Sequence, residues 1–321
     1  MSSHVLQRLL SFFITLAVTS VVVFGVLEWL PGNAAQVILG ETATPESLAA
    51  MEEKLGLHQP ALTRYLQWTG GLLQGQTGLS ISYDTPTLDL MRERLQVTLP
   101  LAILAMTITV AVALSLGVYA ASKQNSAADM GVMTLSQLGL ALPNFWLAIL
   151  LILLFAVQLQ WVSAGGFPGW SAAAGGGIGK GLAALILPAL ALAAVQTAIL
   201  TRVTRSAVID TMSEDYVRTA RAKGLSKHQV LWRHVLRNSL IPVVTIMGLQ
   251  FGNLITSAII IENVFVLPGM GRLVFQAIAN RDLVVVRDVV MLLSAFVILI
   301  NFCIDLLYAW IDPRLSARPG H

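Results

Sequence analysis

A glycine-rich run, residues 174–181, is the first segment of the chain that could do chemistry. It approaches the G-x-x-x-x-G-K-[ST] pattern of a loop that cradles nucleotide phosphates. However, Ala174 stands where the first glycine belongs, and Gly181 replaces the closing serine or threonine after Lys180. The topology derived below also places the run outside the membrane, where ATP is absent. We interpret it as a flexible loop.

No set of residues has the spacing of a catalytic or metal site. The single cysteine, Cys303, lies in an apolar run and excludes an intramolecular disulfide or a site of several thiolates. Serines occur in apolar segments without a Gly-x-Ser-x-Gly nucleophile elbow. The five histidines lie outside the apolar spans and lack zinc-site spacing; they are His4, His58, His228, His234 and His321. We therefore assign no catalytic residue, metal ligand or cofactor to this chain.

The composition indicates a membrane protein. Of 321 residues, 56% are hydrophobic and only 12% are charged, against about 25% charged residues in ordinary soluble domains. The net charge of +3 reflects few ionisable groups rather than a basic surface, so nucleic acid is not implied as a partner.

The apolar residues are gathered into stretches of the length that a bilayer requires, about 20 residues each. The first is longer than the apolar core of a signal peptide, about 7 to 15 residues, so we keep it as a helix. We predict an all-α integral membrane protein with six transmembrane helices, at 9–27, 95–122, 131–157, 181–201, 238–261 and 289–311. Pro143 is expected to bend the third of them.

Basic residues give the orientation of these six helices. With the N-terminus inside, the cytoplasmic segments carry 12 Lys and Arg residues and the short outside loops carry 4. The remaining four lie in the long outside segment, where charge counts little. The excess of basic residues in the inside segments predicts that both termini are cytoplasmic.

The outside segment 31–97 is the least apolar part of the chain. Thr44 followed by Pro45 indicates the start of a helix, and Gly56 indicates its end. We expect a small folded cap in which the run from Gly75 to Ser80 forms a turn and a short extended piece. A connector that merely covers the bundle is the other interpretation.

The cytoplasmic segment 202–240 holds 8 of the 20 basic residues, which by itself fits a solvated loop. Helix-start and helix-stop signals indicate that it is also folded into helices. Ser213 is expected to cap a helix that has acidic residues in its first turn, Arg221 and Lys223 in its last, and Gly224 at its stop. These charges match the helix dipole at both ends.

A second helix is expected directly after the glycine. Ser226-Lys227-His228-Gln229 is a capping-box pattern, and an apolar stripe follows up to Pro242. Ala220 and Ala222 leave the bend between the two helices uncrowded. The segment therefore predicts a helix, a glycine and a helix held outside the lipid.

These residues closely resemble a known cytoplasmic loop. It is that of the permease subunits of bacterial ABC importers of the dipeptide, oligopeptide and nickel group. The matching runs are Asp215-Tyr216-Val217-Arg218-Thr219-Ala220-Arg221-Ala222-Lys223-Gly224-Leu225, Arg233-His234-Val235-Leu236-Arg237-Asn238 and Ile241-Pro242. Arg218-Thr219-Ala220 occupies the place of the Glu-Ala-Ala triplet of the general "EAA" loop, so that motif is only partly kept.

The resemblance extends along nearly the whole chain through landmarks in the family's order. These landmarks are Arg8-Leu9-Leu10, Leu30-Pro31-Gly32-Asn33, Leu55-Gly56-Leu57-His58-Gln59-Pro60, Leu142-Pro143-Asn144-Phe145-Trp146, Ile261-Glu262-Asn263-Val264-Phe265, Pro268-Gly269-Met270-Gly271-Arg272 and Asp312-Pro313-Arg314. The resemblance implies the type I transmembrane fold of ABC importers. We divide the chain into a cytoplasmic tip with the first helix (1–30), a periplasmic cap (31–97), a five-helix permease core (98–311) and a cytoplasmic tail (312–321).

The resemblance also implies the partners and the site. We expect a second homologous permease subunit, two ATPases that bind ATP and magnesium, a periplasmic substrate-binding protein and membrane lipid, all at the inner membrane. The residues implied in ATPase coupling are Asp215, Tyr216, Arg218, Thr219, Ala220, Arg221, Ala222, Lys223, Gly224 and Leu225. The chain itself is expected not to be an enzyme.

Other functions stay open. An ion-coupled secondary transporter would need a buried carboxylate, for which Glu28 and Asp305 are the candidates, and both lie near span ends. A membrane enzyme ranks third. Within the resembling family the cargo is a peptide or nickel; the spans hold no histidine to ligate a bare metal ion, which favours a peptide-like solute.

Overall fold

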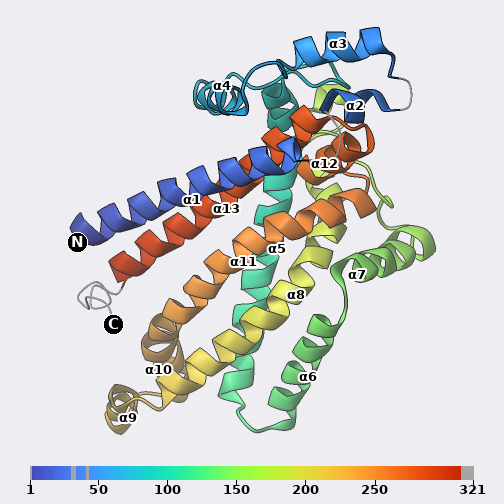
Figure 1. Ribbon diagram of the computed structural model, residues 1–321. Coiled ribbons are helices and arrows are strands. Elements are labelled where there is room, and N and C mark those ends of the chain that lie inside the picture. Colours follow the sequence, from blue (N-terminus) through green and yellow to red (C-terminus); the bar gives the residue numbers. More distant parts are fainter. Residues whose placement is uncertain (1, 30–33, 41–42, 312–321) are drawn as a thin grey trace. The chain divides into compact units, whose positions relative to one another are not determined.

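The computed structural model describes residues 2–29, 34–40 and 43–311 and is almost wholly helical (Figure 1). In the described residues, extended structure is limited to one isolated antiparallel bridge between Leu79 and Pro86. The α-helices are α1 (Ser2–Glu28), α2 (Ala34–Leu39), α3 (Pro45–Lys54), α4 (Ala61–Leu73), α5 (Thr87–Ser122), α6 (Ala127–Ala141), α7 (Asn144–Leu151), α8 (Ile178–Met212), α9 (Asp215–Ala222), α10 (Lys227–Val230), α11 (Leu236–Val264), α12 (Met270–Ala279) and α13 (Leu283–Ile311). Two π-helical segments, η2 (Ile152–Gln158) and η4 (Leu231–Val235), and one 3₁₀ turn, η3 (Ala172–Ala174), complete them.

Five helical runs are long and apolar enough to cross a membrane, and they confirm the predicted class. They are α1, α5, α8, the continuous run from α10 through α11, and α13. Helix α6 with α7 and η2 makes a sixth where this bent pair is counted as one span. The predicted tail 312–321, with the landmarks Leu30-Pro31-Gly32-Asn33 and Asp312-Pro313-Arg314, lies outside the described residues.

The prediction of one helix over 131–157 is wrong. The chain breaks between α6 and α7 with a bend of 100°. Leu142 adopts an extended conformation and Pro143 precedes the first residue of α7. Proline lacks an N–H and disfavours the helical conformation in the residue before it, so the bend expected at Pro143 is a complete interruption.

The chain divides into two compact units. One is formed by Met1–Thr98 with Pro268–Phe302, and the other by Leu99–Leu267 with Cys303–His321. The first unit therefore contains the whole range of the predicted cap, 31–97, together with α1, α12 and most of α13. The domain boundaries expected from the sequence stay a prediction.

In the first unit the predicted helix start is confirmed in detail. The backbone N–H of Ser47 donates to Thr44 Oγ1 at 3.2 Å, and the backbone N–H of Thr44 donates to Ser47 Oγ at 2.9 Å, which forms a reciprocal capping box. Gly56, at φ +64°, follows the end of α3 as expected. The helices α2, α4 and α12 were not predicted.

Two buried carboxylates, Asp282 directly before α13 and Asp288 within it, bind polar segments of the first unit. Asp288 accepts hydrogen bonds from Trp68 Nε1 at 2.8 Å and Thr87 Oγ1 at 2.6 Å. Asp282 accepts from Ser80 Oγ at 2.6 Å. These hydrogen bonds satisfy polar groups that would be costly to bury without partners. Glu28, a candidate coupling acid for a secondary transporter, forms an ion pair with Arg64.

In the second unit α8 is the central helix, packed against α6, α7 and α11 (Figure 1). Small residues bring its neighbours close. A Cβ atom added to Gly117 of α5 would lie 2.6 Å from Thr204 Cβ and 2.9 Å from the carbonyl oxygen of Thr201. Close approach through small residues is typical of helices that associate in lipid.

The close contact at Gly117 predicts that alanine is destabilising there but not at a glycine with free space around it. Gly117→Ala overpacks the α5–α8 contact and should destabilise the protein by about 1–3 kcal/mol. Gly131→Ala is the control, because a Cβ there meets nothing within 4 Å and alanine favours the helix by up to about 1 kcal/mol. Thermal unfolding in detergent should place the Gly117→Ala midpoint below that of wild type and the Gly131→Ala midpoint at or above it. Equal midpoints for the two variants would contradict the packing described.

Candidate functional site

Helix α9 is a short helix with complementary charge at both ends. It begins at Asp215, after Glu214 in the N-cap position, and carries Arg221 in its last turn. Acidic residues near the first N–H groups and basic residues near the last carbonyls are favourable in the helix field. The predicted charge pattern is confirmed.

The glycine stop forms a complete helix termination. Gly224 has φ +85°. Its N–H donates to the carbonyl oxygen of Arg221 at 3.0 Å, and the N–H of Leu225 donates to that of Ala220 at 3.4 Å. These two bonds are the Schellman motif, which satisfies carbonyls that would otherwise lack a donor at the helix end.

One face of α9 is buried in the protein's own core. Val217 is fully buried and Ala220 is 7% exposed. They belong to an apolar cluster, named here the loop core, with residues from the ends of α5 and α8 and from the helix that follows. Its buried members are Val118, Ala121, Val208, Val217, Ala220, Val230 and Val235. Leu225 packs against this cluster. The segment is therefore a folded element rather than a free loop.

The opposite face of α9 is open to solvent. Of the ten predicted coupling residues, Ala220 is buried and Leu225 is half-buried. The exposed ones, named here the α9 outer face, are Asp215, Tyr216, Arg218, Thr219, Arg221, Ala222, Lys223 and Gly224. Asp215 pairs with Arg218 at 3.5 Å on the surface, a contact that contributes little stability. The outer face therefore presents three cations around a small apolar residue, Ala222.

Two details of the predicted helices need correction. Ser213 does not cap α9: it follows the last residue of α8, and its Oγ donates to the carbonyl oxygen of Asp210 at 2.6 Å. The second helix and the predicted span 238–261, expected as separate segments, form one helical run: Pro242 lies inside α11, which continues to Val264. Helix α8 extends to Met212, so Ser213 closes the last turn of α8 instead of capping the start of α9.

The start of the second helix is confirmed. The N–H of Gln229 donates to Ser226 Oγ at 3.3 Å, and the N–H of Ser226 donates to Gln229 Oε1 at 3.1 Å. From Lys227 the helical run passes through α10 and the π-helical η4 into α11. A π-helical turn inserts one extra residue and is frequent at functional sites.

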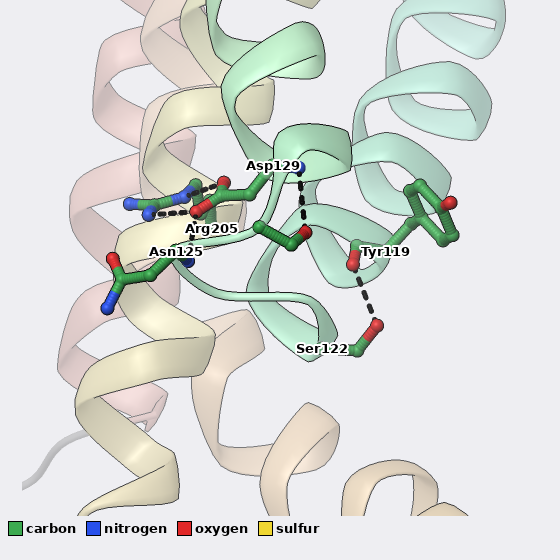
Figure 2. Close-up of polar contacts among 6 residues, drawn as sticks. Tyr119, Ser122, Asn125, Asp129 and Arg205 are labelled. Carbon is green, nitrogen blue, oxygen red and sulfur yellow. Dashed lines mark hydrogen bonds and ion pairs between the residues drawn. The ribbon is translucent and has the colours of Figure 1, made fainter.

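The sequence did not reveal two polar contacts that position this element. Asn238 Nδ2 donates to Tyr216 Oη at 2.7 Å and ties α9 to α11. Arg205 of α8 binds Asp129 of α6 through two parallel bonds, Nε to Oδ1 at 2.6 Å and Nη2 to Oδ2 at 2.7 Å (Figure 2). Asp129 follows the N-cap Ser126 by three residues, which marks a helix start, but nothing in the sequence names Arg205 as its partner.

The glycine-rich run that approaches a phosphate-binding pattern forms the entry to α8. Gly175 and Gly177 have positive φ, and Lys180 Nζ donates to the carbonyl oxygen of Gly175 at 3.0 Å, so this lysine is engaged with its own loop. Within the described ranges, no group of three or more His, Cys, Asp or Glu side chains could hold a metal ion.

Comparison with known families now decides the class. The profile of the family described as "Binding-protein-dependent transport system inner membrane component" matches residues 113–317. That of its N-terminal region matches residues 1–113. The chain belongs to this family of transport permeases. Helix α9 falls in the larger match, as do the described spans other than α1 and most of α5.

Similar proteins share nearly their whole length with this permease. A protein of Brucella suis biovar 1 named as a peptide transport system permease is 40% identical, with 98% of this chain and 99% of the relative covered. The dipeptide transport system permease of Alkalihalophilus pseudofirmus is 36% identical, with 98% and 100% covered. The glutathione transport system permease of Escherichia coli O6:H1 is 38% identical, with 99% and 100% covered.

A solved structure shares the fold. A chain of the MetNI methionine ABC transporter, in a crystal form titled as inward facing, superposes with a TM-score of 0.58 at 17% identity. The match covers 70% of this permease and 96% of that chain. The predicted type I transmembrane fold of ABC importers is confirmed.

If the loop core holds α9, weakening the core should speed hydrogen exchange of the α9 backbone amides. Val217→Ala removes two buried methyl groups and should cost about 2 kcal/mol of local stability, because the cluster cannot close the gap completely. Exchange of the backbone amides in 215–225 should accelerate in this variant. Arg218→Ala, on the exposed face of the same helix, is the control and should leave exchange within about twofold of wild type, because surface changes cost less than about 0.5 kcal/mol. Equal protection in both variants would show that α9 does not depend on the loop core.

Proposed function

We propose that this permease is one transmembrane subunit of an ATP-driven importer of peptides or peptide-like solutes. It would form the membrane pathway with a second, homologous permease subunit, while two ATPases supply energy and a periplasmic binding protein delivers the cargo. The observation that carries the proposal is α9, a capped helix whose apolar face is held by the protein's own core and whose charged face is open.

A rigid helix with an open face is suited to receive force. A solvated loop would deform under a partner's movement, whereas α9 contacts the ends of α5 and α8 through the loop core. Displacement of α9 therefore requires displacement of these helices. Such rigid-body movement of packed helices is a known form of switching between two states of a protein. The α9 outer face, centred on Ala222 with Arg218, Arg221 and Lys223 around it, is the proposed ATPase contact, and the cations favour an acidic surface on that partner.

The proposed orientation places both termini and α9 in the cytoplasm. The distribution of 12 basic residues against 4 supports it. The cap, with α3 and α4, would then face the periplasm, where the binding protein docks. Both permease subunits would lie in the inner membrane, and ATP and magnesium would bind only to the ATPase partners.

The names of the relatives favour a peptide-like cargo over nickel. Peptides, dipeptides and glutathione are all named for proteins that match this chain almost end to end. These solutes share a peptide backbone but differ in size. A shared passage for them needs weak and unspecific contacts, which leaves selection to the separate binding protein.

A charge placed on the α9 outer face should block ATPase docking. Ala222→Glu adds a carboxylate to an exposed position without entering the loop core, and we expect at least about tenfold less ATPase to copurify with the tagged protein, together with loss of uptake. Ala222→Ser is the matched control and should behave as wild type. Ala220 and Gly224 are less suitable positions, because Ala220 is buried and Gly224 has φ +85°, so substitution there disturbs folding and docking together. Normal ATPase recovery with Ala222→Glu would contradict the proposed contact.

The cargo is tested by uptake into proteoliposomes that hold the complete complex with its own binding protein. We expect ATP-dependent, saturable uptake of labelled di- to oligopeptides that unlabelled peptides suppress. Uptake of nickel should stay at the level of protein-free liposomes. Saturable nickel import unaffected by peptides would show that the peptide assignment is wrong.

A further inference from the structure

The ion pair between Asp129 and Arg205 is the strongest polar contact between α6 and α8. Its two parallel bonds, at 2.6 and 2.7 Å, use the planar fork of the guanidinium. The Asp129 side chain is 4% exposed and that of Arg205 is 22% exposed. A planar pair with two hydrogen bonds fixes the orientation of the two side chains as well as their distance. A lysine in place of the arginine, or a single hydrogen bond, would fix only the distance.

The carboxylate of Asp129 is also fixed from its own side. Its Oδ2 accepts the backbone N–H of Asn125 at 2.9 Å (Figure 2). The backbone N–H of Asp129 donates to Ser126 Oγ at 3.3 Å. The start of α6 and the turn before it are therefore organised around the group that Arg205 holds. Pulling on Arg205 would move the first turn of α6 rather than rotate one side chain.

Further along the two helices, contact is direct. A Cβ on Gly139 of α6 would lie 3.5 Å from Ala198 Cβ of α8. The contact lies three residues before the break at Leu142 and Pro143, where the helix direction changes by 100°. Helix α6 is thus joined to α8 near both ends, and its hydrogen-bonded ladder stops at the proline.

Arg205 lies close to α9 along the chain. Helix α8 ends at Met212, and α9 begins at Asp215 after two residues. Val208, one turn beyond Arg205, is a buried member of the loop core. A force on α9 therefore reaches Arg205 through one turn of regular helix.

We propose that the Asp129–Arg205 pair is a positioning device that makes α6 move as one body with α8 and α9, with the break at Leu142 and Pro143 as the end of that body. The inference rests on the proposed function, because α9 must be displaced by the ATPases for the pair to transmit anything. The pair would carry the displacement to a helix that α9 does not itself contact through the loop core. Asp129 and Arg205 act on transport through α6 and touch no substrate.

A reversible covalent bond between α6 and α8 tests this directly. In a Cys303→Ser background, Gly139→Cys with Ala198→Cys places two Cβ atoms 3.5 Å apart, within the range of about 3.5–4.5 Å that a disulfide needs. If the helices move as one body, the oxidised complex keeps the ratio of peptide transported to ATP hydrolysed that the same sample shows after reduction. If oxidation abolishes transport and reduction restores it, the helices must move past each other and the proposal is overturned.

The ion pair is tested in the same complex. Arg205→Gln should lower the ratio of transport to ATP hydrolysis about tenfold, without loss of assembled complex, and the oxidised cysteine pair should restore that ratio. A variant that only lost stability would lower assembly, hydrolysis and transport together, and a disulfide would not change their ratio. An unchanged ratio in Arg205→Gln overturns the proposal. If Arg205→Gln fails to assemble, the proposal is tested by the cysteine pair alone, through the ratio of transport to ATP hydrolysis before and after reduction.

The wild-type complex separates this inference from the proposed function. If wild-type proteoliposomes take up no peptide with ATP, the proposed function fails and the pair has nothing to transmit. If wild type transports peptide but the oxidised cysteine pair is inactive, or Arg205→Gln is fully coupled, the inference alone fails.

Discussion

The packing of Val217 and Ala220 into the loop core is the contact on which the functional interpretation depends. Without it, α9 would be an eight-residue helix in water, too short to be stable alone. With it, the helix is tied to α5 and α8, and its charged face is held outward in one orientation. An apolar contact of a few side chains thus makes this polar segment a folded part of the second unit, which the proposed docking of an ATPase requires.

The second unit combines two kinds of helix contact that have different consequences. Gly117 against Thr204 and Gly139 against Ala198 are close approaches of small residues, which give tight packing but little directional restraint. The Asp129–Arg205 pair adds direction, because both its bonds lie in one plane. The break at Pro143 then limits how far a shift of α6 extends. Packing, ion pair and break together are the contacts on which the proposed joint movement of α6 and α8 rests.

How far the sequence predicts this structure differs from residue to residue. Helix ends set by local chemistry were predicted well: the helix start at Thr44, the capping box at Ser226 and the stop at Gly224 involve only residues within a few positions of each other. Ser213 was assigned to the wrong helix, because a serine between two helices can serve either. The bend at Pro143 was expected, but its full extent depends on the packing of α6 and α7 separately against α8.

Contacts between distant residues were out of reach of the sequence. Helix α4 was not predicted, and its Trp68 is held by Asp288, 220 residues away. The ten residues predicted to contact the ATPase were named as one set, in which Ala220 was grouped with Ala222 although the first is buried and the second exposed. Their difference is set by which side of α9 faces α5 and α8. In a helix of eight residues with small and charged side chains, composition alone does not decide this.

The central claim is that the α9 outer face receives the ATPases, and the labelling rate of one cysteine tests it most directly. Ala222→Cys in a Cys303→Ser background, in inverted inner-membrane vesicles, should react with a membrane-impermeant maleimide, and added ATPase subunits should slow that reaction at least about tenfold by covering the residue. Thr44→Cys, exposed on the cap, should stay unlabelled in the same vesicles with or without the ATPases. An equal labelling rate at position 222 in the presence and absence of ATPase subunits that copurify with the complex would contradict the account.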